Sequence, residues 1–274
     1  MVMQSQRPDV PALARERPAW RAVAIPSEHG GWGLTFEPVL LGLLVQPSWP
    51  GAAIGVAALT AFLVRTPLKF AVGDRRRHRL LRRTRLADAI ALGELALIAA
   101  LVVLAGAGAG WSWTVPVLFA LPLFGVELWY DIRSRGRRLV PELCGGVGIA
   151  SVAAAIAIAG SRPGALAAAL SLIVAARAMA SIPFARTQVA RLHARPVRLV
   201  NSDAFQVAGV LVAIVAAIVE WPVVLGAIAV AVAAATQLVS TRRPVPPAKR
   251  LGLAQLAVGL IVVAATAAGV LAWT

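Results

Sequence analysis

Acidic and basic side chains lie inside or beside the long apolar stretches of this chain. An ionisable group within such a stretch costs about 3 kcal/mol to insert into a membrane, so it needs a partner, water or a function. If these groups meet in the fold, they form a charged site in otherwise apolar surroundings. The candidate ligand-binding residues are Glu28, His29, Glu37, Arg65, Lys69, Glu127, Asp131, Arg177 and Arg186.

The first candidate segment, residues 26–33, reads Pro-Ser-Glu-His-Gly-Gly-Trp-Gly and is followed by Glu37. Gly30, Gly33 and Glu37 are spaced three and four residues apart, so in a helix they share one stripe. That stripe carries a carboxylate about two turns into the helix, and its glycines permit close approach of another helix. In one interpretation the Glu-His pair and Glu37 line a site. In the other, Ser27 and the following glutamate stabilise the helix N-terminus, which leaves Glu37 unexplained.

Two further pairs of charged residues are spaced four positions apart, which places each pair on one helix face. Arg65 and Lys69 are basic, and they either meet a phosphate or extend their long stems to the membrane surface. Glu127 and Asp131 are acidic, and they either hold Mg²⁺ together with a bound diphosphate or neutralise neighbouring arginines. Glu142 could join them. The hypothesis of a metal site therefore rests on very few carboxylates.

Arg177 lies inside an apolar stretch, and Ser181 follows it on the same helical face. A guanidinium has a fork of donors that matches the oxygens of a phosphate or carboxylate group. The interpretation as a ligand clamp competes with an internal ion pair, for which the sequence offers several carboxylates within predicted spans. These are Glu37, Glu94 and Glu127.

The composition indicates the class of protein. Of the 274 residues, 59% are hydrophobic and the mean hydropathy is +0.78, more than one soluble core requires. Lysine and arginine number 27 against 12 acids, yet almost all of the charge lies in short clusters between long uncharged runs. This pattern is typical of a polytopic membrane protein whose partner is the lipid bilayer, and it requires no nucleic acid. The single cysteine excludes a disulfide framework and a cysteine-based zinc site.

Uncharged runs of about 20 residues predict membrane-spanning helices, because lipid offers no partner for an open backbone. We predict an all-α transmembrane bundle of nine spans, at 30–45, 51–72, 86–107, 111–130, 139–159, 164–184, 204–220, 223–239 and 251–273. Every second connection is rich in arginine, and the positive-inside rule makes that side cytoplasmic. The N-terminus is then cytoplasmic and the C-terminus external. Residues 1–25 are expected to be a mobile basic tail, and residues 26–274 a single transmembrane domain.

Three segments carry a resemblance to a known family. They read Pro26-Ser27-Glu28-His29-Gly30-Gly31-Trp32, Glu37-Pro38-Val39-Leu40-Leu41-Gly42 and, with a weaker match, Ile182-Pro183-Phe184-Ala185-Arg186. In these segments the chain resembles the YwiC-like family of bacterial membrane proteins, and its length and hydropathy agree with that family throughout. The resemblance implies a multi-pass protein of the bacterial cytoplasmic membrane. It implies no reaction, since the family has no established biochemical activity.

The number and orientation of the spans, with polar stretches after the second and sixth, are also similar to the layout of UbiA-type intramembrane prenyltransferases. In that superfamily, Asp-rich motifs in those two stretches hold Mg²⁺ and an isoprenyl diphosphate. The corresponding residues here are 65–74 and 186–191, where basic residues stand in place of the acids. The resemblance thus implies an arrangement of helices and is compatible with a phosphate ligand. The absence of the Asp-rich motifs argues against metal-dependent prenyl transfer.

These observations favour a helical bundle with a cavity open to the cytoplasmic leaflet, whose mouth carries Arg65, Lys69, Arg177 and Arg186. The expected ligand is an anionic lipid or an isoprenoid phosphate, with its tail between the helices. A prenyltransferase-like reaction would be assisted by the arginines as the diphosphate departs. The alternatives are a transporter of a small anion or metabolite and a non-catalytic membrane scaffold. In a scaffold, the intramembrane charges would pair with one another and leave no cavity.

Overall fold

The computed structural model describes residues 19–24, 29–133 and 138–273, and all the regular elements within them are helices. Eight helical segments are long and apolar enough to cross a membrane, and the shorter α2 accounts for the remaining predicted span. The expected all-α class is therefore confirmed. The elements are α1 (Ala19–Ala24), α2 (His29–Val45), α3 (Trp49–Arg76), α4 (Arg82–Ala109), α5 (Thr114–Ile132), α6 (Leu139–Ile149), α7 (Ser151–Ala159), α8 (Gly164–Leu192), α9 (Leu199–Val219), η1 (Trp221–Val223), α10 (Val224–Ser240) and α11 (Ala248–Trp273).

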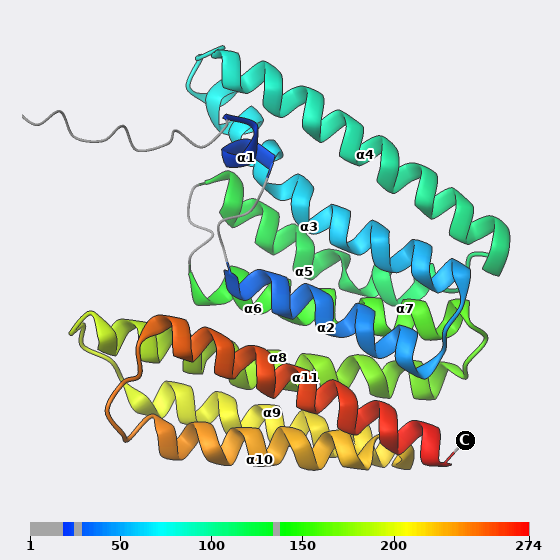
Figure 1. Cartoon of the computed structure of the whole chain (residues 1–274), viewed down its shortest axis with the longest axis vertical. Coiled ribbons are helices and arrows are strands. Elements are labelled where there is room, and N and C mark those ends of the chain that lie inside the picture. Colours follow the sequence, from blue (N-terminus) through cyan, green and yellow to red (C-terminus); the bar gives the residue numbers. More distant parts are fainter. Residues whose placement is uncertain (1–18, 25–28, 134–137, 274) are drawn as a thin grey trace, which may run out of the picture.

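The long helices lie side by side in an elongated stack (Figure 1). α4 forms one edge and packs on α3, while α9 and α10 form the opposite edge and pack on α8 and α11. The helices α3, α5, α8 and α10 all finish at one end of the stack, which we call the basic end. α1 packs on α3 and α4 at this end, and it is the described part of the predicted basic tail.

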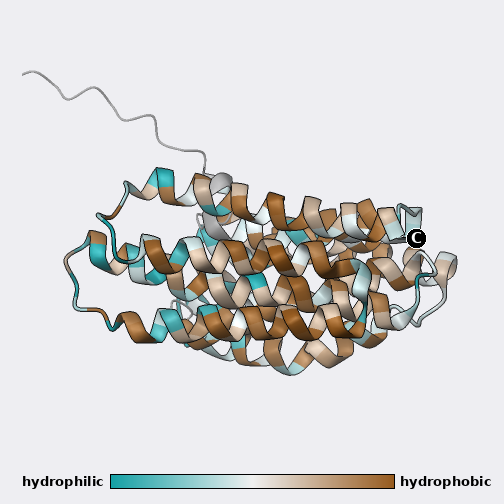
Figure 2. Cartoon of the chain, turned by 90° about the horizontal axis from the view of Figure 1, so that it is seen from below, coloured by the Kyte–Doolittle hydropathy of each residue, from teal (hydrophilic) through white to brown (hydrophobic). Residues whose placement is uncertain are grey.

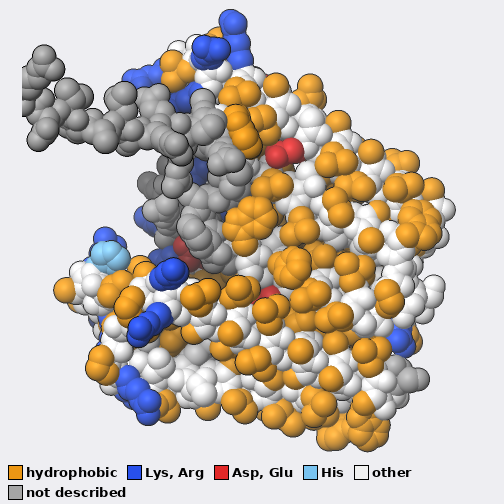
Figure 3. All heavy atoms as spheres, in the orientation of Figure 1, with side chains coloured by type: hydrophobic (Ala, Val, Ile, Leu, Met, Phe, Trp, Pro, Cys, Tyr) orange, Lys and Arg blue, Asp and Glu red, His pale blue; other side chains and the backbone are white. Residues whose placement is uncertain are grey.

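The side chains are distributed as a membrane requires. Hydrophilic residues gather at the basic end, whereas the middle of the stack is hydrophobic (Figure 2). In the space-filling view, most of the visible Lys and Arg side chains lie at that end, and hydrophobic side chains cover much of the remaining face (Figure 3). Leu92, Phe119 and Ile218 are 72%, 81% and 78% exposed in α4, α5 and α9. Such exposure is favourable in lipid, so the chain is a multi-pass membrane protein.

The interior is built from small residues that let the helices approach closely. Ala153, Ala155 and Ala157 of α7 are fully buried. A Cβ at Gly42 of α2 would lie 2.7 Å from the side chain of Ile156, so α2 and α7 can pack this tightly only with glycine there. Small residues serve helix packing in lipid because close contact, and not exclusion of water, holds the helices together.

Several helices extend beyond the predicted spans, α3 and α8 at their ends and α4 and α9 at their starts. α3 continues to Arg76 and α8 to Leu192, so the polar stretches expected as loops are mostly helical. Arginine, glutamine and leucine are good helix formers, and their helices continue beyond the apolar run. The predicted fifth span agrees with the apolar segment Leu139–Ala159, which a turn at Ala150 divides into α6 and α7. The hydroxyl of Ser171 in α8 donates to the Ala150 carbonyl at 2.9 Å and so satisfies an acceptor near the break.

Candidate functional site

Glu37 and Arg177 form an ion pair in the interior, which we call the deep pair. Nη2 of Arg177 in α8 lies 3.0 Å from Oε1 of Glu37 in α2, and the side chains are 5% and 2% exposed. The same nitrogen donates to the carbonyl oxygen of Gln255 in α11 at 2.7 Å. Gly259 follows one turn later, and a Cβ there would overlap the Glu37 carboxylate. Three helices therefore enclose the deep pair, and the third approaches it through a glycine.

A second group of charges lies nearer the basic end. Arg65 of α3 contacts two carboxylates of α5, with Nη1 2.8 Å from Glu127 and Nη2 2.8 Å from Asp131. The Arg65 side chain is 38% exposed, while those of the two acids are 13% and 16% exposed. The sequence alternative in which these acids neutralise neighbouring arginines is thus the one present in the structure.

A neighbouring ion pair joins this group through α6. Glu142 of α6 and Arg186 of α8 are 2.8 Å apart, and their side chains are 34% and 38% exposed. Gly145 follows Glu142 by three residues, and a Cβ at Gly145 would overlap the Glu127 carboxylate. One turn of α6 therefore contacts both groups of charges. We call the whole set the rim cluster, comprising Arg65, Glu127, Asp131, Glu142 and Arg186.

The structure therefore divides the candidate residues into two places and does not gather them at one mouth. Lys69 is exposed on α3, one turn beyond Arg65. His29 begins α2, but its side chain and the whole of Glu28 lie outside the described residues. Glu94 of α4 forms no ion pair with either place among the described residues. Its Oε2 is buried and has no hydrogen-bond partner among the residues that the structure describes.

The donor set does not fit a magnesium-bridged diphosphate of the UbiA type. Glu127 and Asp131 both contact the guanidinium of Arg65. Asp74, in the stretch equivalent to the first Asp-rich motif, accepts hydrogen bonds from Arg83 and Thr84. Residues 186–191 contain no carboxylate at all. In the described ranges, no three His, Cys, Asp or Glu residues come close enough to hold a metal ion.

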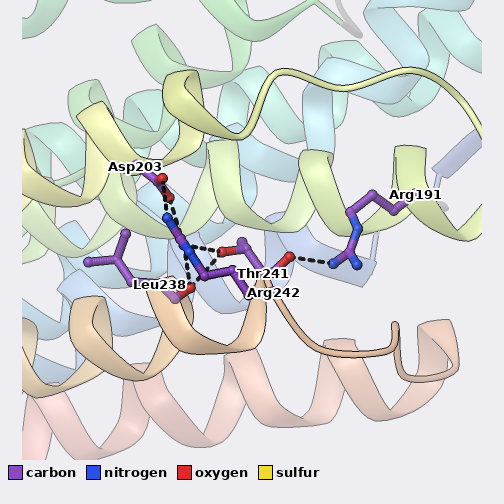
Figure 4. A network of polar contacts seen from close by, with 5 residues as sticks. All are labelled: Arg191, Asp203, Leu238, Thr241 and Arg242. Atoms are coloured by element: carbon purple, nitrogen blue, oxygen red, sulfur yellow. Dashed lines mark hydrogen bonds and ion pairs between the residues drawn. The ribbon is translucent and has the colours of Figure 1, made fainter.

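A polar network that the sequence did not predict joins α8, α9 and α10 at the basic end (Figure 4). Arg242 donates to both carboxylate oxygens of Asp203, at 2.7 and 3.4 Å, and to the Leu238 carbonyl. These hydrogen bonds to Asp203 raise the pKa of the Arg242 guanidinium above its usual value. Arg191 donates to the carbonyl of Thr241 at 2.7 Å. The network ties the α10–α11 connection to α8 and α9.

Two shallow grooves lie on the far edge of the stack, away from both groups of charges. One, of about 500 Å³, runs along α9 and α10 and is lined by apolar residues such as Ile214, Ile218 and Trp221. The other, of about 380 Å³, lies along α10 and includes Ser240 and Arg243. None of the predicted site residues lines either groove.

The first part of the chain, residues 25–158, matches the model of the YwiC-like protein family. Residues 25–158 belong to the YwiC-like family. The match confirms the family expected from the signature at the start of the first span. No curated protein and no solved structure matches the chain. The UbiA-like arrangement therefore stays a prediction.

The YwiC-like region contributes unequally to the two groups of charges. It contains Glu37 and the rim-cluster acids Glu127, Asp131 and Glu142, together with Arg65. The remaining cations come from α8, which lies beyond the matched residues. Both the deep pair and the Glu142–Arg186 pair therefore join the YwiC-like region to the second part of the chain.

Proposed function

We propose that the protein binds the anionic head group of a membrane amphiphile, a lipid phosphate or an isoprenoid phosphate, at the rim cluster. The observation that carries this proposal is the convergence of charged side chains from α3, α5, α6 and α8 near the basic end, where those of Arg65, Glu142 and Arg186 are partly exposed. The guanidinium forks of Arg65 and Arg186 match phosphate oxygens. The partly exposed pair of Glu142 and Arg186 contributes at most about 1 kcal/mol, so a phosphate group can compete with Glu142 for Arg186.

The surroundings of the rim cluster suit such a ligand. Lys69 is exposed one turn from Arg65, and the chain carries a net charge of +15, most of it near this end. α5, which supplies both acids of Arg65, exposes large apolar side chains such as Phe119 against which acyl or prenyl tails can lie. We place the protein in the bacterial cytoplasmic membrane with the basic end inside, in agreement with the positive-inside rule. Anionic lipids of the inner leaflet attract that end.

Lipid analysis of the purified protein tests the proposal. The full chain is purified in detergent, and the co-purified phospholipids and isoprenoid phosphates are quantified separately by mass spectrometry. We expect Arg186→Gln to lose about tenfold or more of the bound ligand, since a hydrogen bond to a charged group is worth about 1.5–3 kcal/mol. Its partner Glu142 is 34% exposed, so the unpaired carboxylate remains hydrated.

Arg242→Gln is the matched control, because it removes another ion pair at the basic end without touching the rim cluster. Equal lipid content in both variants, each monodisperse by size-exclusion chromatography, would contradict the proposal. The rim cluster would then be a purely structural clamp, as the scaffold alternative requires. A ligand lost from Arg186→Gln but retained by Arg242→Gln supports the proposal, and its chemical class follows from the mass spectrum.

A further inference from the structure

The deep pair is a separate place from the rim cluster, and its two charges balance each other in the interior. Glu37 and Arg177 lie near the middle of α2 and α8, and both side chains are at least nine-tenths buried. A buried charge that loses its partner costs about 3–5 kcal/mol. Neither group can therefore change its charge without compensation.

The deep pair also has hydrogen-bonding capacity that the protein does not use. Nε of Arg177 and Oγ of Ser181 are buried and have no partner in the described part of the chain. Ser181 is only 4% exposed and lies one turn after Arg177 on the same helix. Oε1 of Gln255, on the helix whose carbonyl meets Arg177, is likewise unpartnered within the described ranges. Buried polar groups left unpaired, here two donors and one acceptor, cost about 1–3 kcal/mol each, so their presence together points to a bound ligand.

We propose that the deep pair is the binding site of a small monovalent anion that enters together with one proton. The proton is taken up by a carboxylate oxygen of Glu37, which removes the negative charge opposite Arg177. An anion about the size of a carboxylate then becomes the counter-ion of the guanidinium, and it accepts from Nε of Arg177 and from the Ser181 hydroxyl. One positive and one negative charge enter and leave together, and no covalent bond other than the O–H bond changes.

Glu37 is the titrating group in this proposal, and Arg177 is the cation that the structure brings to it. α7 packs on α2 without any ionisable residue. Glu142 is paired with Arg186, and Arg65 with the acids of α5. The ionisable residues on all helices packed against α2 are Arg65, Lys69, Asp74, Arg75 and Arg76 on α3, Glu142 and Cys144 on α6, Arg177, Arg186 and Arg191 on α8, and Lys249 and Arg250 on α11.

Buried polar side chains mark a route from the basic end to the deep pair. Gln206 of α9 donates to the carbonyl of Ala180, the neighbour of Ser181, and to Oε1 of Gln237, both at 2.9 Å. Ser202 lies one turn closer to the basic end than Gln206. Ser202 Oγ, Gln206 Oε1 and Gln237 Nε2 are buried and have no partner in the described segments. Gln206 contacts α8 at Ala180, in the same turn as Arg177 and Ser181. An anion or water that enters from the basic end therefore has polar contacts on the way to the deep pair.

Anion titrations of the purified protein test the proposal. Chloride, nitrate and formate are titrated separately into the full chain in detergent by calorimetry, between about pH 5 and pH 8, and proton uptake is followed with a pH dye in weak buffer. Because one proton accompanies each anion, the affinity of the wild type falls up to tenfold for each pH unit above the titration of Glu37. Glu37→Gln imitates the protonated acid, so it binds the anion with no pH dependence and no proton uptake. Arg177→Gln does not bind it.

Arg242→Gln is the control, and it should titrate like the wild type. A failure of the wild type to bind any of the three anions across this pH range overturns the proposal. So does a pH dependence that is the same in Glu37→Gln as in the wild type. Arg177→Gln leaves a buried carboxylate without its partner, so Glu37→Gln decides the matter if Arg177→Gln does not fold. Since the rim cluster is not involved, these outcomes are independent of lipid binding.

Discussion

Gly259 of α11 lies against both members of the deep pair, since a Cβ there would overlap the Glu37 carboxylate and lie 3.0 Å from Nη2 of Arg177. We expect Gly259→Ala to destabilise the protein by about 1–3 kcal/mol, because an added methyl group in a packed interior displaces its neighbours. Gly252 on the same helix is the control. It has open space around its Cβ position, so Gly252→Ala should be neutral or stabilise the helix by about 0.5–1 kcal/mol. Thermal unfolding in detergent measures both, and equal midpoints would contradict the packing argument.

The sequence identified charges inside the predicted spans but not their partners. It offered Glu37, Glu94 and Glu127 for Arg177, and only the lateral arrangement of α2, α8 and α11 selects Glu37. Periodicity reports which face of a helix a residue occupies, whereas pairing depends on which helix lies opposite. Gln255 was missed for the same reason, although a glutamine within an apolar helix is itself a signal of a buried polar contact.

The turn between α3 and α4 is held by Asp74, which is 3% exposed. It accepts from Nε and Nη2 of Arg83 at 3.0 and 2.7 Å and from the Thr84 hydroxyl at 2.8 Å. Asp74→Ala removes these charged hydrogen bonds and should therefore open the turn. Because a more open turn is a better protease substrate, trypsin should cleave at residues 77–82 at least about tenfold faster. Asp88→Ala removes the more exposed pair with Arg75 and should change the rate little. Similar cleavage of the two variants would show that Asp74 does not hold the turn.

At the scale of helices, the predicted spans agree with the structure because each is a single, mostly apolar run bounded by arginine clusters or turn residues. The predictions were wrong where helical propensity and hydropathy disagree. α8 continues past the predicted end at residue 184 to Leu192, through polar residues that favour a helix but not lipid. The break at Ala150 was missed because its neighbours are apolar on both sides, and the compensating hydroxyl of Ser171 comes from another helix.

For the whole molecule, the direction of each helix follows from the number of crossings. α2 starts at the basic end and α11 finishes at the opposite end, so an odd number of crossings separates the two termini of the described bundle (Figure 1). Because successive crossings alternate in direction, α3, α5, α8 and α10 all finish on one side, where the arginines lie. The positive-inside rule predicts that this side is cytoplasmic, and both proposals require the rim cluster and the polar route to the deep pair to face it.

Reporter fusions test this orientation directly. Alkaline phosphatase fused after Trp273 should be active, because it matures only outside the cytoplasm, and green fluorescent protein at the same position should be dark. A truncation fused after Arg243, in the connection between α10 and α11, is the control and should give the opposite result. Because basic residues resist export, the sign of the charge at each connection predicts which reporter works. Bright fluorescence after Trp273 would mean an even number of crossings. Either the start of α2 or the end of α11 would then lie on the side of the membrane opposite to the predicted one.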